Sequence, residues 1–492
     1  MRDLQVKLIN NPSIVRWFQL LNIFEKKQIV TTVYLAKKIG ASQRTIISDL
    51  SSLKRHFGES ASFHAGNNGY EFQEIDMYQY SKKKQELLGN EPVYEIFGNI
   101  FYGDLDTITD TAHYLNYSVG SLRRILASIQ PVLRNYSLTL SVNPINIHGD
   151  ESCIRKFFLD FYYEGFHTPY TMHPPKRFQE ILLGFLDESE KDIELDTGSS
   201  FACFYYTVYI VVERNRQGHT IDLCPKLAKQ IYKEKDFDRL EKCLITLGET
   251  YDFQLTKQEV AWIHYTLLTK RPLNDSRSEA LFYERFCLWP EVNFLAKKFI
   301  EHHGYNDWNK KALNTFFKSI FLSIKINDAI CPILNRTMTD TITTIKESYP
   351  KEFKQNIAFL KKNINNEFYS SRLFNDIAAI LTAYCHILAI YHTPRKKIVF
   401  LLEGDYLNIQ NIKAQAIKYL GNSHDLQFLP IWSVDNSILN DYQSDLIITN
   451  YAPHVTDYLL SKKHILTNPT IHAHDWQRIF KQLALNWHQF FD

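Results

Sequence analysis

Apolar residues recur at helical spacing in two stretches near the start of the chain. The first stretch places apolar side chains at Ile46, Leu50, Leu53 and Phe57. The second places them at Leu122, Ile125, Leu126, Ile129 and Leu133. Steps of three and four residues align side chains along one face of a helix. Each stretch therefore predicts an amphipathic helix whose apolar stripe faces a core.

The residues before each of these helices predict a tight turn. Each copy has an Ala four residues before a residue that tolerates a left-handed backbone, Gly40 in the first and Asn116 in the second. A Ser follows two residues later, Ser42 or Ser118, where its hydroxyl can cap the next helix. This is the helix-turn-helix layout, in which the second helix enters the DNA major groove.

A strand-like segment follows each predicted helix pair. Residues 61–72 alternate apolar and polar positions around a turn at Gly66–Gly69, and residues 138–147 form a similar segment. A glycine-containing turn between alternating segments predicts a β-hairpin. A hairpin after the recognition helix is a wing, so both units are predicted to be winged helix-turn-helix units.

The face opposite the first apolar stripe carries cations and hydroxyls and no carboxylate, because Asp49 lies off it. Arg side chains can bind guanine or phosphate, and Ser hydroxyls can meet either. The candidate DNA-contacting residues of both units are Ser42, Gln43, Arg44, Thr45, Ser48, Ser51, Lys54, Arg55, Ser118, Ser121, Arg123 and Arg124. The competing interpretation is a pair of αα-hairpins packed in a helical core, with solvated arginines. Two copies with matched Ala, turn and cap positions favour the helix-turn-helix.

Charge separates the two units. The whole chain carries a formal net charge of only +2, which argues against a bulk polycation. Residues 1–75 hold ten Lys and Arg against six Asp and Glu, a net charge of +4. Residues 76–148 hold six Lys and Arg against seven Asp and Glu, a net charge of −1. The first unit is therefore expected to be the stronger electrostatic anchor on DNA.

Several classes of protein lack support in the sequence. The first residues have no apolar signal core, and the longest apolar run, 201–212, is too short to span a bilayer. The seven cysteines are scattered without a Cys-x-x-Cys pair, so we expect buried free thiols in a reducing cytoplasm, with no metal and no cofactor. No Gly-rich phosphate loop, His-Glu-x-x-His or serine elbow occurs, so an enzyme is not expected.

The rest of the chain predicts a multidomain, mainly α protein. Two helical, aromatic-rich segments of similar length form a loose repeat that divides near residues 271–278. After residue 397, two short apolar strands at 398–402 and 445–450 alternate with helical stretches. This alternation predicts a small parallel α/β domain at the C-terminus.

This order of parts resembles the Mga/AtxA family of transcription regulators of Gram-positive bacteria, many of which control virulence genes. Segments 208–214, 255–263 and 376–381 resemble helices of the PTS regulation domains (PRDs) that the family's helical modules are similar to. The resemblance implies a homodimer that binds promoter DNA, regulated by PTS-dependent histidine phosphorylation through phosphocarrier proteins. The implied domains are two winged helix-turn-helix units at 1–75 and 76–150, PRD-like domains at 151–275 and 276–393, and a PTS IIB-like α/β domain at 394–492.

The chain departs from the family pattern at the phosphorylation sites. Thr207 and Thr266 occupy positions where the pattern has histidines. The candidate acceptors are therefore displaced histidines, namely His219, His386 and His264, of which His219 ranks first because a loop can reach a donor protein. The loop at 402–407 lacks the cysteine that an active IIB domain phosphorylates. The resemblance thus implies dimerisation or partner docking for the C-terminal domain, without phosphotransfer.

Two other function classes remain open at this point. An RNA-binding antiterminator also contains PRDs, although its N-terminus carries a small β-rich RNA module in place of winged units. The other alternative is an interaction scaffold that binds no nucleic acid. A competition assay between duplex DNA and hairpin RNA would distinguish an antiterminator from a DNA-binding regulator. Failure to bind DNA at low salt would favour the interaction scaffold.

Overall fold

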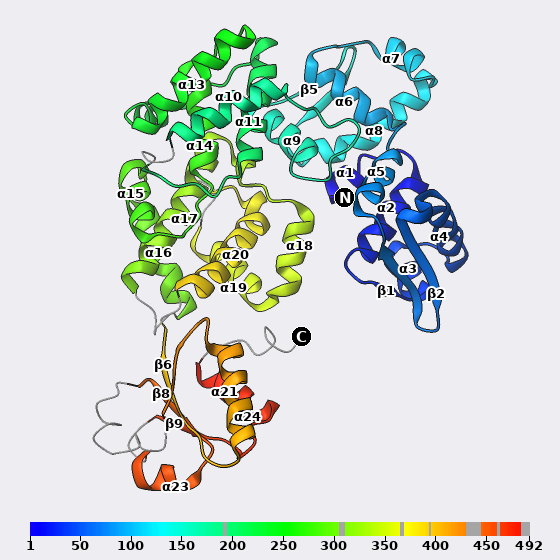
Figure 1. Ribbon diagram of the computed structural model, residues 1–492. Coiled ribbons are helices and arrows are strands. Elements are labelled where there is room, and N and C mark those ends of the chain that lie inside the picture. Colours follow the sequence, from blue (N-terminus) through cyan, green and yellow to red (C-terminus); the bar gives the residue numbers. More distant parts are fainter. Residues whose placement is uncertain are drawn as a thin grey trace. The chain divides into compact units, whose positions relative to one another are not determined.

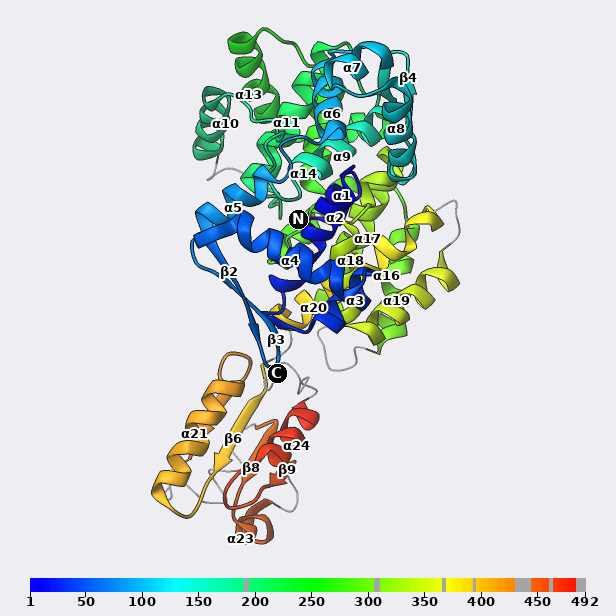
Figure 2. The same cartoon turned by 90° about the vertical axis from the view of Figure 1, so that its right-hand side faces the viewer.

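The computed structural model describes residues 1–189, 194–304, 310–364, 369–392, 395–429, 444–459 and 463–483 (Figures 1 and 2). The chain divides into two compact units. One comprises residues 1–304 with 312–383, and the other comprises 305–311 with 384–492. The first unit is mainly helical with two small sheets, and the second contains a four-stranded sheet.

The N-terminal part of the first unit packs short helices against a three-stranded antiparallel sheet of order β1-β3-β2. Its elements are α1 (Asp3–Val6), α2 (Pro12–Phe24), β1 (Ile29–Val30), α3 (Thr32–Ile39), α4 (Gln43–Phe57), β2 (Ala61–Gly66) and β3 (Gly69–Glu74). The predicted apolar stripe of α4 is confirmed, since Ile46, Leu50, Leu53 and Phe57 are all buried. They pack with Phe24, Phe63 and Phe72 in one core.

The predicted turn between α3 and α4 is also confirmed. Gly40 ends α3 with φ 76° and ψ 31°, the left-handed conformation that a glycine adopts without steric cost. The Ser42 hydroxyl caps α4 by accepting a hydrogen bond from the Thr45 amide at 3.1 Å. These two residues fix the angle at which α4 leaves α3.

The hairpin after α4 is anchored by a close backbone approach. Gly69 begins β3 with φ 123°, and a Cβ built there would lie 2.5 Å from the carbonyl oxygen of Val30 in β1. A side chain at position 69 would therefore push β1 and β3 apart. Residues 67 and 68 form the two-residue turn between β2 and β3, as the sequence predicts.

A buried carboxylate joins α4 to α2. Asp49 accepts hydrogen bonds from Arg16 Nε at 2.8 Å and from the Trp17 indole at 2.9 Å. The Asp49 side chain is only 9 % exposed, so its charge is compensated inside the fold.

The second helix pair has the same kinds of turn, helix cap and hairpin as the first. It lies within α5 (Met77–Glu86), α6 (Pro92–Tyr102), α7 (Ile108–Tyr114), α8 (Val119–Arg134), β4 (Thr139–Val142) and β5 (Ile145–His148). Asn116 adopts φ 57°, and the Ser118 hydroxyl accepts from the Ser121 amide at 3.1 Å. The five predicted apolar residues of α8 are buried, and β4 pairs with β5 as a hairpin. The predicted turn, cap and hairpin are therefore present in both copies.

Helix α9 (Glu151–Tyr162) packs on α6, the helix before the second helix pair, through aromatic rings. Phe97 of α6 lies edge-on to Phe157 and Phe161, with ring centroids 5.2 and 5.3 Å apart. Phe101 makes the same contact with Phe158 at 5.2 Å. Helix α9, which begins at residue 151, therefore shares an aromatic core with α6.

The other side of α9 carries a buried ion-pair network. The Arg155 side chain has no exposed surface and binds Glu259 of α14 (Lys257–Leu268) at 2.6 Å. Glu151 binds both Arg155, at 3.0 Å, and Arg214 of α11 (Phe201–Arg216), at 2.8 Å. Helix α9 is thus joined to the helical part of the chain by paired charges.

Two further sets of helices complete the first unit. The first set comprises α11 and α14, described above, together with α10 (Lys176–Ser189), α12 (Pro225–Ile231) and α13 (Lys235–Tyr251). The second contains α15 (Ser276–Phe286), α16 (Glu291–His303), α17 (Lys310–Ile330), α18 (Thr339–Ser348), α19 (Pro350–Asn363) and the first part of α20 (Phe374–His392). The predicted division near 271–278 falls between the end of α14 and the start of α15. Arg271 of the connecting segment forms a fully buried ion pair with Glu279 of α15 at 2.9 Å.

The C-terminal unit is a parallel α/β fold, as predicted. Its four strands are all parallel in the order β7-β6-β8-β9. Its elements are β6 (Lys397–Leu401), α21 (Tyr406–Leu420), β7 (Asp425–Phe428), β8 (Leu446–Thr449), α23 (Ala452–His454), β9 (His464–Leu466) and α24 (Ala473–Leu483). Helices α21 and α24 bury Ile412 and Trp476 against one face of the sheet (Figure 1). The predicted boundary at 393–394 lies outside the described residues.

His264 is enclosed in the core of the first helical set. Its side chain is 7 % exposed and lies beside an apolar cavity lined by Phe204, Leu240 and Leu268. Burial lowers the pKa of His264 from 6.5 to about 4, so the ring is neutral at pH 7.

Among the described residues, no helix is both long enough and apolar enough to cross a membrane.

Replacing Asp49 with Ala should loosen the first helix-turn-helix. The substitution leaves the Arg16 guanidinium and the Trp17 indole without their acceptor, a loss of about 2 kcal/mol. Hydrogen–deuterium exchange of α2 and α4 in the full chain should therefore accelerate. Asp104→Ala removes an exposed carboxylate and is the matched control. Equal exchange in the two variants would contradict the assigned role of Asp49.

The buried His264 should make α14 sensitive to acid. Between pH 6.5 and pH 4 the unfolded chain binds a proton at this ring that the folded chain does not, so stability falls as the pH falls. The loss at pH 5 should be about 2 kcal/mol. Hydrogen exchange of α14 at pH 7 and pH 5 measures it, after correction for intrinsic exchange rates. His264→Leu should reduce this acid sensitivity, and an unchanged pH dependence would show that other groups cause it.

Candidate nucleic-acid interface

The outward face of α4 presents most of the predicted DNA-contacting residues to solvent. Those classed as exposed are Ser42, Gln43, Arg44, Ser48, Ser51, Lys54 and Arg55, and Thr45 is half-buried. Arg44, Lys54 and Arg55 form no ion pair with any residue in the part of the chain that the structure describes. Because Asp49 is buried against Arg16, this face carries three available cations and no carboxylate.

Some of the predicted hydroxyls already have structural roles. The Ser42 and Thr45 side chains are hydrogen-bonded to each other at 2.8 Å, within the cap of α4. The Ser51 hydroxyl donates to the Ile47 carbonyl at 3.0 Å. Ser48 and the three cations therefore carry the polar groups of α4 that are most available for a ligand.

Further exposed polar groups lie on α3 and on the β2–β3 hairpin of the same unit, and the sequence analysis did not select them. Lys37 and Lys38 are exposed in the last turn of α3. His64, Asn67 and Asn68 are exposed at the end of the β2–β3 hairpin, which projects from the helices in Figure 2. The signal that could have found them is their position: helix ends and wing tips next to a recognition helix commonly meet phosphates.

The predicted recognition helix of the second unit, α8, has fewer available polar groups on its exposed face. Arg123 and Arg124 are exposed on α8, and Arg124 Nε donates to the Gly120 carbonyl at 3.3 Å. Ser118 and Ser121 are joined to each other through their hydroxyls at 2.9 Å in the helix cap. No atom lies within 4 Å of a Cβ built at Gly120, so the start of α8 is open to a close neighbour.

The three candidate histidines lie in different environments. His219 is half-buried after α11, and its carbonyl accepts from Arg155 at 3.2 Å. Burial, followed by the charge of Arg214, lowers the pKa of His219. His386 is partly buried on α20, and His264 is enclosed as described above. His219 and His264 lie on or after helices of the first helical set, apart from α4 in the chain, so they are treated below as candidates for regulation and not for DNA contact.

The loop after β6 is organised by hydrogen bonds to its own neighbours. Asp405 caps α21 by accepting from the Asn408 amide at 3.0 Å. The Glu403 amide donates to Asn450 at 2.8 Å, and its carboxylate lies 3.5 Å from His454. Both acidic side chains therefore have structural partners within the C-terminal unit.

Comparisons with known proteins agree with these features. Residues 75–162, from the end of β3 to the end of α9, match the family model described as the Mga helix-turn-helix domain. The chain is 23 % identical over 415 residues to the capsule synthesis positive regulator AcpA of Bacillus anthracis, covering 80 % of this chain and 83 % of AcpA. It is 22 % identical over 429 residues to AcpB, a capsule synthesis positive regulator of the same organism, with the same two coverages.

A third relative covers more of the chain. It is described as a putative trans-acting regulator of Streptococcus pneumoniae serotype 4, and it is 20 % identical over 488 residues, covering 92 % of this chain and 93 % of that protein. The match to the helix-turn-helix model and the three regulator relatives together support the assignment of this chain to the Mga/AtxA family of regulators.

Proposed function

We propose that this protein is a transcriptional regulator that binds promoter DNA through its two winged helix-turn-helix units. The observation that carries the proposal is the outward face of α4. Arg44, Lys54 and Arg55 lie exposed there, without a carboxylate among them, on a helix held by the Gly40 turn and the Ser42 cap. Such a face fits the phosphates and guanine edges of a major groove.

The two units should contribute unequally to affinity. The first has a net charge of +4 and additional lysines at the end of α3, whereas the second has a net charge of −1. Most of the salt-dependent affinity should therefore come from the first unit. The second, which is packed on α9, would position the first relative to its operator.

The remaining parts are proposed to regulate this activity in the cytoplasm. The helices of residues 151–275 and 276–393 would be PRD-like domains, and residues 394–492 would be an IIB-like domain that docks or dimerises. A dimer would place recognition helices on two half-sites. Helix α9 would then have a double role, because its aromatic side belongs to the helix-turn-helix core and its charged side to the first PRD-like domain.

Removing the α4 cations should weaken DNA binding in a salt-dependent way. Arg44→Ala with Arg55→Ala should lower affinity for candidate promoter duplexes by at least about tenfold and reduce the salt slope by about two, one for each lost phosphate contact. Arg123→Ala with Arg124→Ala should cost less, because the second unit has a negative net charge. Electrophoretic mobility shift across a salt series measures both.

The control is Arg372→Ala, which removes an exposed cation from the second set of helices. Unchanged binding by the Arg44 and Arg55 variant would contradict the proposed interface. Stronger competition by hairpin RNA than by duplex DNA would favour an antiterminator, and absence of DNA binding at low salt would favour a scaffold.

His219 is proposed as a phosphorylation site on physical grounds. It lies near Arg155 and Arg214, which both bind Glu151 in the α9 network. A phosphate adds close to two negative charges and binds arginine strongly. It would therefore compete with Glu151 for these arginines and shift α9, which carries the second helix-turn-helix.

Replacing His219 with Asp should mimic part of this charge. We expect a change in reporter transcription or in the oligomeric state measured by analytical ultracentrifugation, because the new carboxylate competes for Arg155 and Arg214. His219→Ala is the matched control, since it removes the ring without adding charge. If the Asp and Ala variants behave alike in both measurements, His219 is not the switch.

A further inference from the structure

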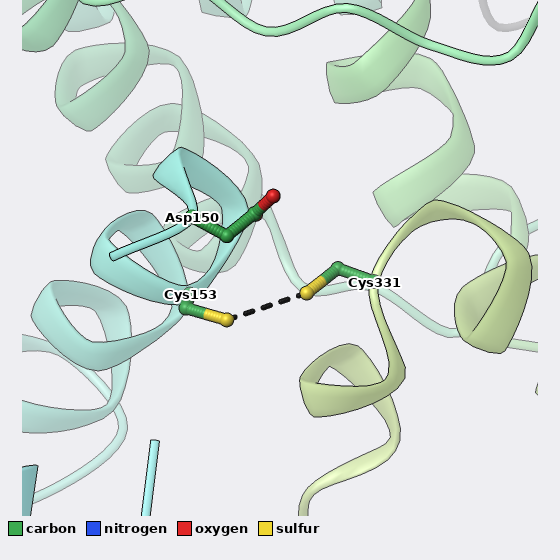
Figure 3. Close-up of side chains that lie close together, drawn as sticks. All are labelled: Asp150, Cys153 and Cys331. Carbon is green, nitrogen blue, oxygen red and sulfur yellow. Dashed lines mark hydrogen bonds between the residues drawn. The ribbon is translucent and has the colours of Figure 1, made fainter. Parts of the chain in front are cut away.

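Two cysteines and a carboxylate from distant parts of the chain meet at one end of α9. The Cys153 and Cys331 sulfurs lie 3.3 Å apart, although 178 residues separate them in the sequence. The donor atoms of Asp150, Cys153 and Cys331 all lie within 4.8 Å of one another. Figure 3 shows the two sulfur atoms facing each other, with the Asp150 side chain beside them.

Local structure explains how the three side chains come together. Asp150 caps α9 by accepting from the Ser152 amide at 2.8 Å, and Cys153 lies three residues later, in the first turn of the same helix. Positions three apart share one face of a helix. Cys331 lies after α17, at the start of the short 3₁₀ helix Pro332–Asn335, and so reaches the cluster from the opposite side.

The surroundings suit a partly enclosed ligand site. Cys153 is 3 % exposed and Cys331 is 7 % exposed, whereas Asp150 is exposed to solvent. The two sulfurs are therefore shielded, and the carboxylate lies where a dissolved ion can enter.

We propose that Asp150, Cys153 and Cys331 form a site for a thiophilic divalent cation, of which Zn²⁺ is the best fit. Thiolates and a carboxylate are established Zn²⁺ ligands, and three protein ligands leave a fourth tetrahedral position for water. Binding would release the two thiol protons to solvent, with no change in oxidation state.

The sulfur separation favours a metal over a disulfide. Two sulfurs bound to one tetrahedral Zn²⁺ at about 2.3 Å lie about 3.8 Å apart. A disulfide requires about 2.05 Å and the removal of two electrons by an oxidant. The observed 3.3 Å is too long for a disulfide and shorter than the metal-bound value, and both cysteines are free thiols at this distance.

A metal here would join the second helix-turn-helix to the second set of helices. Cys153 and the β5 strand are separated by only a few residues, and Arg336, five residues after Cys331, lies over the Tyr136 ring at 4.5 Å. Arg336 also donates to the Asn135 carbonyl, directly after α8, at 3.0 Å. The site would thus reinforce a junction next to the recognition helix. Metal binding itself does not depend on the proposed DNA-binding function.

The test uses the full chain, purified in the presence of a phosphine reductant and freed of metal by chelation. Titration with Co²⁺ alone should produce a thiolate-to-cobalt charge-transfer band in the near ultraviolet. Zn²⁺ should abolish the band by displacement, with one zinc per chain by mass spectrometry of the native protein. No such band, or one that Zn²⁺ does not displace, overturns the proposal.

Three variants locate the site. Cys153→Ser with Cys331→Ser should abolish the band, and Asp150→Asn should weaken Co²⁺ affinity by at least about tenfold. Asn is an equally good helix cap, so this variant tests ligation without removing the cap. Cys243→Ser, which replaces another buried thiol, should leave the band unchanged and is the control.

Two results contradict the proposal directly. One is a cobalt band that survives in the Cys153 and Cys331 double variant. The other is a Cys153–Cys331 disulfide, detected as a loss of two mass units on mild peroxide treatment, in protein that binds no Co²⁺ when reduced. That second result would assign the pair to redox chemistry.

Discussion

The pairing of Arg155 is the constraint on which the arrangement of the first unit depends. A guanidinium without exposed surface is stable only when acidic groups compensate its charge, and Glu151 and Glu259 do so. Removing one such partner costs about 3–5 kcal/mol because a buried charge is left unpaired. Helix α9 is therefore held in one position against α11 and α14. Since its other side is packed with phenylalanines against α6, the second helix-turn-helix is held with it.

The first helix-turn-helix is attached differently. Its apolar core is a separate cluster, and hydrogen bonds and an ion pair join its N-terminal residues to later elements of the first unit. The buried amide of Gln5 donates to the carbonyls of Phe161 and Phe166, and Arg2 binds Asp340 at 2.9 Å. Hydrogen bonds of this kind contribute about 1 kcal/mol each, less than a continuous aromatic core. The unit with the stronger positive charge is thus joined to the rest of the first unit partly through buried polar contacts.

Local patterns in the sequence predicted local structure well. The stripe from Ile46 to Phe57, the Gly40 and Asn116 turns, and the Ser42 and Ser118 caps all depend on residues within a few positions of one another. Periodicity and capping are short-range effects, so a single sequence contains them. The strands at 398–402 and 445–450 were predicted within one residue or two for the same reason.

Contacts between distant segments could not be predicted in this way. Spacing rules detect a metal site when its ligands are near in sequence, but Cys153 and Cys331 are brought together only by the packing of α9 against the segment after α17. The enclosure of His264 likewise depends on α13 and on residues near 204, which a helix pattern does not place. Most of the predicted DNA-contacting residues are exposed, whereas Thr45 and Ser121 are half-buried, and the sequence did not show which hydroxyls are used in caps.

The close approach of Gly69 to Val30 has a consequence for how the wing can diverge among relatives. Because a side chain at position 69 would push β3 away from β1, the register of this sheet is fixed at Gly69, whereas Asn67 and Asn68 are exposed in the turn. Evolution can therefore alter the chemistry at the wing tip while the framework beneath it stays constant. Changes at these two solvent-facing turn positions would alter the wing tip without moving the strands beneath it.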